Sequence, residues 1–281
     1  MNPTGAPARP DLLRARGTIL RAMRRWFDDQ GYLEVHTPTL VDCPAMEEHL
    51  EPVQVGTQFL HTSPEFAMKR VLASGLTRIY QITPCFREEE IGVHHAREFT
   101  MLEWYRTGAG SAELMDEVES LVQTAAQSVQ FDLPPFERRS VSGLMAEAGF
   151  SDSGDEEAWF RCWIDRVEPT LTQPTIVHGY PAWQAALATL RGPIADRFEV
   201  YLGGLELANA FAEETDPSVL RQRFLASAAA RKRSGRTPHP IDEALLSATA
   251  RMPRAAGIAV GVDRLVMALT NTTDIALVQV R

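Results

Sequence analysis

Apolar residues recur every three or four positions in several stretches of the chain, and this spacing predicts helices. The clearest stretch runs from Asp11 to Gln30, and Gly31 follows it as a natural stop. The same spacing predicts three further helices, at 111–128, 217–233 and 241–251.

A helix start is predicted at Ser63-Pro64-Glu65, where a capping residue, a proline at the first position and an acid in the first turn follow one another. Gly75 is expected to close this helix at about Ser74.

β-branched and aromatic residues indicate the strands. Extended runs are predicted at 32–35, 77–87, 98–105, 197–202, 205–213 and 257–261. Gly203-Gly204 predicts a two-residue hairpin turn, and residues 131–175 favour helices joined by exposed loops. Hairpins rather than βαβ units favour an α+β fold, with a mostly antiparallel sheet flanked by helices.

One predicted strand carries a carboxylate on an apolar face. In EFTMLEWY, a period of two places Phe99, Met101, Glu103 and Tyr105 on the same side. A buried charge without a partner is costly, so Glu103 needs a cation. That cation is either a basic side chain of the protein or a ligand.

The predicted hairpin brings two acids together. A turn at Gly203-Gly204 would place Tyr201 opposite Glu206 and Glu199 opposite Ala208. Glu199 and Glu206 would then be diagonal neighbours roughly 7 Å apart. They suit Mg²⁺, which prefers oxygen ligands. Taken by itself, however, the hairpin pattern favours the alternative, two exposed strand acids that tolerate each other in water.

Further along this strand, three residues alternate onto the face opposite to that of Glu206: Asn209, Phe211 and Glu213. If all four line one pocket, a β-bulge must lie between Glu206 and Asn209.

Two arginines are candidate anion binders. In Gly261-Val262-Asp263-Arg264, Asp263 is the expected cap and Arg264 lies in the first helical turn, where the helix dipole disfavours a cation. A bound anion would resolve this conflict. Arg87 enters a charged loop from a strand and is the second candidate. The chain has neither a Walker loop nor a GxGxxG motif, so an ATP site here is neither P-loop nor Rossmann.

Composition narrows the class of protein. The 281 residues are 44% hydrophobic with a net charge of −9, which opposes a dedicated nucleic-acid binder. The basic run at 231–236 is interpreted as a solvated helix end. Cys43, Cys85 and Cys162 lie far apart, as expected in a reducing cytosol. No apolar run reaches the ~20 residues of a membrane span. We expect a soluble cytoplasmic protein with a loose, disordered tail at 1–10.

Several of these segments resemble known motifs. FREEEIGVHHAREFTMLEWY resembles motif 2 of class II aminoacyl-tRNA synthetases, GIAVGVDRLVMAL resembles motif 3, and the segment 32–40 resembles motif 1. SPE at 63–65 and FEVYLGGLELANAFAEETDP are similar to the lysyl-tRNA synthetase branch. The resemblance covers about 30–281.

Within that branch, the chain resembles the EpmA (PoxA/GenX) family of lysyl-tRNA synthetase paralogues. These lack the anticodon-binding OB-fold, and they share Ala208 and Ala259 where the synthetases usually have glycine. The resemblance implies one catalytic domain at 11–281 without an OB-fold, a six- or seven-stranded antiparallel sheet and a homodimer.

The resemblance also implies an activity. ATP and Mg²⁺ would activate (R)-β-lysine or lysine as an aminoacyl-adenylate, which is transferred to a lysine of elongation factor P. A lysine aminomutase would supply the β-lysine, and no stable contact with nucleic acid is expected.

Residue roles follow from the same resemblance. Arg87 and Arg264 would be the catalytic residues, and Glu199 and Glu206 would hold Mg²⁺. The implied ATP contacts are Arg87, Glu88, Glu89, His95, Phe99, Glu206, Leu207, Gly261 and Arg264. The implied amino-acid contacts are Ser63, Pro64, Glu65, Glu103, Tyr105, Asn209, Phe211, Glu213 and Ala259, with Glu65 taking the backbone-type amine.

Two departures from the family pattern keep alternatives open. His-Asn-Pro-Glu-Phe becomes a sequence with Ala96 after His95, and Asn-Gly-Phe becomes Asn209-Ala210-Phe211. The alternatives are a truncated synthetase that charges tRNA and a non-catalytic paralogue that binds lysine or AMP.

Overall fold

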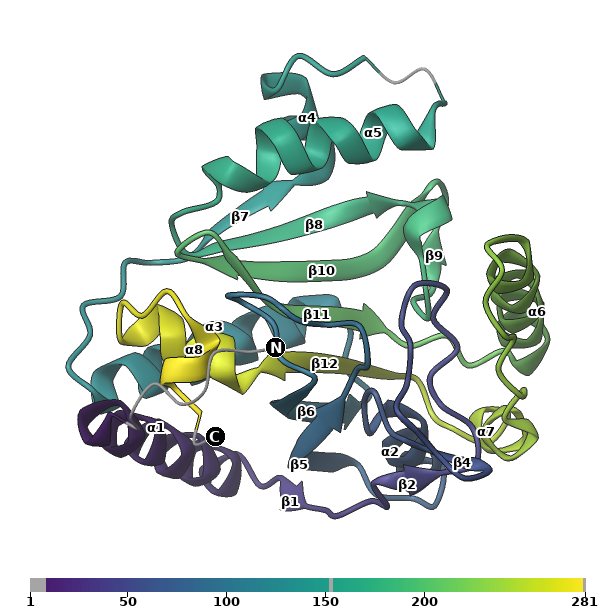
Figure 1. The fold of residues 1–281 in the computed structure, drawn as a ribbon, viewed down its shortest axis with the longest axis horizontal. Helices are drawn as coiled ribbons and strands as arrows, with labels where there is room; N and C mark the ends of the chain where they lie inside the picture. Colours follow the sequence, from purple (N-terminus) through teal and green to yellow (C-terminus); the bar gives the residue numbers. More distant parts are fainter. Residues whose placement is uncertain (1–8, 152–153, 280–281) are drawn as a thin grey trace.

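The computed structural model describes residues 9–151 and 154–279, and its centre is one large twisted sheet (Figure 1). The strands follow the order β1 (Leu33–Glu34), β5 (Arg78–Phe86), β6 (Glu98–Thr107), β12 (Ala255–Gly261), β11 (Leu205–Ala212), β10 (Ile194–Leu202), β8 (Thr175–Pro181) and β7 (Glu137–Ser140), and β9 (Leu190–Arg191) also pairs with β10. Neighbours are antiparallel, apart from the β1–β5 and β7–β8 pairs at the two edges.

A small second sheet and eight helices surround this sheet in the described part of the chain. The small sheet has the order β2 (Leu40–Val41), β4 (Gln58–Leu60) and β3 (Gln54–Val55). The helices are α1 (Pro10–Asp29), α2 (Glu65–Leu72), α3 (Ser111–Ser128), α4 (Val141–Glu147), α5 (Glu156–Cys162), α6 (Pro217–Arg233), α7 (Glu243–Thr249) and α8 (Val262–Leu269). Shorter helical turns lie at Trp163–Val167, Glu168–Thr170, Ala182–Gln184 and Ile275–Leu277.

The α+β class and every predicted helix and strand are confirmed, but the predicted six or seven strands are too few. Nine strands join the large sheet. The strand β8 was missed because Gly179, which has a φ of +77°, and Pro181 interrupt its apolar run. The edge strands β7 and β9 are only four and two residues long.

The two faces of the central strands have different tasks. On β6, Leu102 and Trp104 are fully buried in the main hydrophobic core, where α1, α3 and α8 cover the sheet. The ring of Phe27 from α1 stacks on Tyr80 with ring centroids 4.2 Å apart. The opposite face is therefore left free to form the floor of a cavity.

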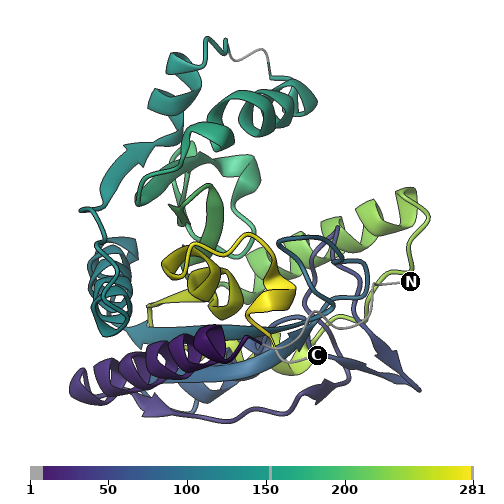
Figure 2. The same ribbon diagram turned by 60° about the vertical axis from the view of Figure 1, so that its left-hand side comes forward.

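Residues 131–175 hold helices and loops, as predicted, and build a second small core above β8 and β10. Trp159 and Trp163 stack with ring centroids 5.2 Å apart, and Tyr180 and Tyr201 join them in this core. Figure 2 shows α4 and α5 standing on this end of the sheet, well away from α1. No helix among the described residues is long and apolar enough to cross a membrane.

Candidate active site

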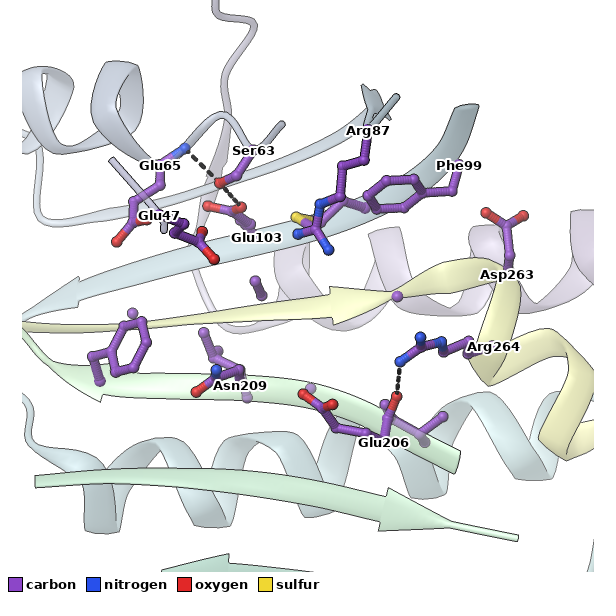
Figure 3. Close-up of a pocket in the computed structure, with 18 of the residues that line it drawn as sticks. Glu47, Ser63, Glu65, Arg87, Phe99, Glu103, Glu206, Asn209, Asp263 and Arg264 are labelled. Atoms are coloured by element: carbon purple, nitrogen blue, oxygen red, sulfur yellow. Dashed lines mark hydrogen bonds between the residues drawn. The ribbon is translucent and has the colours of Figure 1, made fainter. Parts of the chain in front are cut away.

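A cavity of about 370 Å³ lies on the free face of β6, β12 and β11 (Figure 3). The predicted site residues that line it are Ser63, Glu65, Arg87, His95, Phe99, Glu103, Tyr105, Glu206, Leu207, Asn209, Phe211, Glu213, Ala259, Gly261 and Arg264. Four predicted site residues do not line it: Pro64, Glu88, Glu89 and Glu199. Phe99, Met101, Glu103 and Tyr105 all face the cavity, which confirms the alternation predicted for β6.

Glu103 is held by neutral donors. The Ser63 hydroxyl donates to Glu103 Oε1 over 2.5 Å, and the Tyr105 hydroxyl donates to Oε2 over 3.0 Å. Burial, and then repulsion from Glu65, raise the pKa of Glu103 to about 8. No basic side chain among the described residues bonds to this carboxyl group, so the structure does not supply the first of the two cations considered, a basic side chain of the protein.

Ser63 is not the helix cap that its sequence predicts. The helix α2 begins at Glu65 and ends at Leu72, with Pro64 in the N-cap position, so the helix begins one residue later and ends two residues earlier than predicted. The Ser63 hydroxyl still accepts the Glu65 N–H at 3.0 Å, but it donates its own proton to Glu103. The tight turn at Pro64 thus fixes a ligand-facing carboxylate rather than a helix end.

Lys69, which sequence reasoning missed, is a buried partner of two of the cavity acids. Its ammonium lies 2.7 Å from Glu65 Oε1 and 2.6 Å from Glu213 Oε2, and its side chain is 2% exposed. Burial lowers the pKa of Lys69, but Glu213 and Glu65 outweigh it and raise the pKa overall. The Glu65–Lys69 spacing of four on one helix was the available signal.

One carboxylate oxygen of Glu213 is not paired with Lys69. The residue lines the cavity and is 2% exposed, and its buried Oε1 has no hydrogen-bond partner among the described residues. Burial raises the pKa of this carboxyl above its usual range, while Lys69 opposes the rise. An unpartnered buried acceptor is costly, so a donor from a ligand would stabilise it.

The β10–β11 hairpin has the predicted turn and the predicted bulge. Tyr201 pairs with Glu206 as expected, but the register then shifts, so that Val200 pairs with Ala208. Leu207 is the extra residue, between Glu206 and Asn209. The expected pairing of Glu199 with Ala208 is wrong, because the bulge moves Glu199 opposite Asn209.

Glu199 is already well supplied with donors. Tyr180 and Tyr201 donate to its Oε2 over 2.5 and 2.7 Å, and Arg197 bonds to its Oε1. A carboxylate has about four acceptor positions, so one remains. Arg197 was also missed, although it lies two residues before Glu199 and therefore on the same face of β10.

Glu206 is the more available of the two predicted Mg²⁺ ligands. Its side chain makes no hydrogen bond within the described residues, and burial followed by repulsion from Glu199 raises its pKa. No group of three or more His, Cys, Asp or Glu in the described ranges is arranged to hold a metal by itself. Of the two, only Glu206 lines the cavity, so a cation bound there would take its remaining oxygens from elsewhere, such as a phosphate.

Arg264 faces the cavity from the first turn of α8. It donates to the Glu206 carbonyl over 2.8 Å and to His95 Nε2 over 2.5 Å. Burial, and then Arg264, lower the pKa of His95, which favours its neutral, accepting form. Asp263 is not the expected cap, because Gly261 is the N-cap residue.

Asp263 instead ties α8 to the first helix and to β6. It accepts a hydrogen bond from Arg16 of α1 over 2.5 Å and another from the Thr100 N–H of β6 over 2.6 Å. The start of α8, and with it Arg264, is fixed in this way.

Arg87 lies across the cavity from Arg264 (Figure 3). Its guanidinium is 5.0 Å from the centre of the Phe99 ring and donates to Glu90, another missed residue, over 2.9 Å. Two arginines and an aromatic ring thus share one cavity with a set of acids. This arrangement can bind a phosphorylated aromatic base and an ammonium group side by side.

The two remaining predicted ATP contacts lie on the surface. Glu88 pairs with Arg97 at 3.2 Å, and Glu89 pairs with Arg236 at 2.7 Å. The Glu88 side chain is partly exposed and the Glu89 side chain is exposed. Their predicted contact with ATP requires the loop after β5 to rearrange.

The fold is that of a class II tRNA synthetase domain. The family model for class II tRNA synthetases (D, K and N) matches residues 6–280. The relatives include proteins named elongation factor P–(R)-β-lysine ligase from Vibrio cholerae and Photorhabdus laumondii, which are 38% and 40% identical. Both alignments cover 91% of this chain and 90% of the relative. The chain therefore belongs to the class II tRNA synthetase family and, within it, to the family of these ligases.

Proposed function

We propose that this protein uses ATP to activate (R)-β-lysine or lysine and transfers the acyl group to a lysine side chain of elongation factor P. The observation that carries the proposal is the buried, unpartnered Oε1 of Glu213 in the same cavity as Arg87 and Arg264. The names of the relatives support the same substrate and acceptor.

The first step joins the amino acid to AMP. A carboxylate oxygen of the amino acid attacks the α-phosphorus of ATP, and the bond to the β-phosphate oxygen breaks, which releases pyrophosphate. Arg87 balances the charge that develops at the α-phosphate, and Arg264 holds the terminal phosphate. Phe99 stacks on the adenine ring. Catalysis here is positioning and charge stabilisation.

The second step makes an amide. The neutral amine of the acceptor lysine attacks the acyl carbon of the adenylate, the acyl–phosphate bond breaks, and AMP leaves while the amine loses a proton. No covalent intermediate with the enzyme is needed.

Glu206 and Glu199 would hold Mg²⁺ beside the phosphates. The ion would neutralise phosphate charge, while Tyr180, Tyr201 and Arg197 fix the Glu199 carboxylate. Glu206 is kept open to the cavity by the bulge at Leu207.

The amine pocket selects a cationic side chain. Glu103, Glu213, Tyr105 and Asn209 would surround the distal ammonium of the substrate, a point charge with three donors. Ala259 lies between Glu103 and Asn209 in the sheet, and its methyl group would limit the space for the substrate there.

We further propose a cytoplasmic homodimer, supplied with β-lysine by a lysine aminomutase. The apolar side chains that support a dimer are on the short strands β1 and β2 and in β3, where Leu33, Leu40 and Val55 are 51%, 41% and 47% exposed.

ATP–pyrophosphate exchange tests the proposal. The enzyme is assayed with α-lysine and (R)-β-lysine in parallel, and the labelled acyl group is then chased into purified elongation factor P or bulk tRNA. Labelling of the protein alone is expected. Labelling of tRNA would favour the tRNA-charging alternative, and no exchange with any amino acid would favour the non-catalytic one.

A further inference from the structure

The side chain of Glu47 enters the cavity from the segment between β2 and β3, and the roles set out above do not use it. It lines the cavity together with Glu65, Arg87 and Arg197 (Figure 3). Although the side chain stays open to the cavity, burial of the carboxyl raises its pKa, an effect that Arg87 opposes.

The backbone around Glu47 is fixed. Arg231, which is fully buried, donates from Nη1 to the carbonyl oxygens of Glu47, Glu48 and Leu50 over 3.4, 3.1 and 2.8 Å. The preceding Met46 is buried in an apolar cluster with residues of α2, α6 and α7. Glu47 is therefore presented to the cavity from a rigid support.

The hydrogen-bonding capacity of Glu47 is unused. Three other cavity acids are engaged within the protein: Glu65 by Lys69, Glu90 by Arg87, and Glu103 by Ser63 and Tyr105. The Glu47 carboxylate has no hydrogen bond or ion pair to any described residue. A carboxylate held beside an arginine in this way has room for a cationic group of a ligand.

We propose that Glu47 binds the ammonium group nearest to the reacting carboxylate of the substrate, so that the cavity selects a diamino acid. This inference rests on the proposed function, in which Arg87 attracts that carboxylate. Arg87 and Glu47 would then recognise the two opposite charges at one end of the molecule, while Glu103 and Glu213 bind the ammonium at the other end. Glu65, to which the family resemblance gives the nearer amine, shares its Oε1 with Lys69, so Glu47 would add a second carboxylate at this ammonium.

The Glu47→Gln variant tests this against Glu48→Gln, a matched control. Glu48 is the next residue, is equally tied through its carbonyl to Arg231, and does not line the cavity. Binding of α-lysine, (R)-β-lysine and 6-aminohexanoate is measured by calorimetry. The last compound keeps the distal ammonium and the carboxylate but lacks the nearer amine.

For Glu47→Gln we expect the Kd of the diamino acid that wild type binds best to rise about tenfold or more, the usual effect of losing a charged hydrogen bond. The Kd of 6-aminohexanoate should stay within about twofold, and Glu48→Gln should match wild type for every ligand. Equal losses for all three compounds, or no loss for the diamino acids, would overturn the inference.

The same experiment separates this inference from the proposed function. Calorimetry needs no chemistry, so it reports on Glu47 even if wild type shows no pyrophosphate exchange. Exchange by wild type together with unselective binding losses in Glu47→Gln would refute the role of Glu47 and leave the ligase proposal standing.

Discussion

Gly257 makes room for the amine pocket. It pairs with Tyr105 across β12 and β6. A Cβ atom at this position would lie 2.2 Å from Tyr105 Cε1 and 2.7 Å from Glu213 Oε1. The ring and the carboxylate can hold their positions only because this residue has no side chain.

We therefore expect Gly257→Ala to push Tyr105 and Glu213 out of place. Overpacking of this kind costs about 1–3 kcal/mol of stability, and the KM for the amino acid should rise at least tenfold, with a smaller effect on the KM for ATP. Pyrophosphate exchange and thermal unfolding measure the two effects. Gly17→Ala is the control, because its Cβ would make only an ordinary 3.7 Å contact. An unchanged amino-acid KM in Gly257→Ala would contradict the role of this glycine.

Amino-acid affinity should depend on pH through Glu103. With a pKa of about 8, this carboxyl is protonated in the empty protein at neutral pH, and an ammonium ligand favours its ionised form. Binding therefore releases a proton, so affinity should rise by up to about tenfold per pH unit as the pH approaches 8 and level off above it. Calorimetry between pH 6 and 9 measures this slope. Glu103→Gln should flatten it, and parallel profiles for the two proteins would refute the assignment.

At the scale of elements, α6 supports the segment that carries Glu47. The basic run at 231–236 was interpreted as a solvated helix end, and for Arg231 this is wrong, because its side chain is 0% exposed. It pairs with Glu51 at 2.7 Å and also donates to the Thr237 carbonyl. The end of α6 is thus an anchor for the cavity wall.

We expect Arg231→Ala to destabilise the protein by about 3 kcal/mol, because it leaves several carbonyl groups and Glu51 with fewer donors. Residues 45–51 should exchange amide hydrogens faster. Lys232→Ala is the control, since this neighbouring side chain is exposed and should change stability by less than about 0.5 kcal/mol. Urea unfolding measures the loss of stability, and hydrogen exchange measures the faster exchange of residues 45–51. Equal effects of the two substitutions would show that Arg231 is not an anchor.

At the scale of the molecule, one face of the large sheet packs into the hydrophobic core and the other face forms the cavity. The central strands β6, β12 and β11 carry the cavity floor, and β1 lies at one edge. That edge and the small sheet expose apolar residues, which is where we expect the second copy of the chain to pack.

Leu40→Glu should convert the proposed dimer to a monomer, because a charge would replace an apolar side chain at the contact. Light scattering coupled to gel filtration should give twice the mass of the chain for wild type and the mass of one chain for the variant. Leu225→Glu on α6, also at an exposed leucine, is the control and should remain dimeric. A monomeric wild type would refute the proposal for this surface.

The sequence by itself determined the long helices, most of the central strands and the face of β6 that lines the cavity. Helical and strand periodicities depend on neighbours in the chain, so Phe99, Glu103 and Tyr105 could be placed on one side without a structure. The bulge before Asn209 was predicted only on the condition, which the family resemblance requires, that four residues of mixed parity line one pocket.

Only the tertiary structure decided which charges are paired. Lys69 meets Glu213 across 144 residues of sequence, Asp263 meets Arg16 rather than capping its own helix, and Glu47 stays unpaired in the cavity. Such pairings depend on how distant elements pack. Burial removes a charged group from water at a cost in free energy, and only a partner brought near by packing can offset that cost. The local pattern of hydrophobic and polar residues does not indicate which distant residue that partner is.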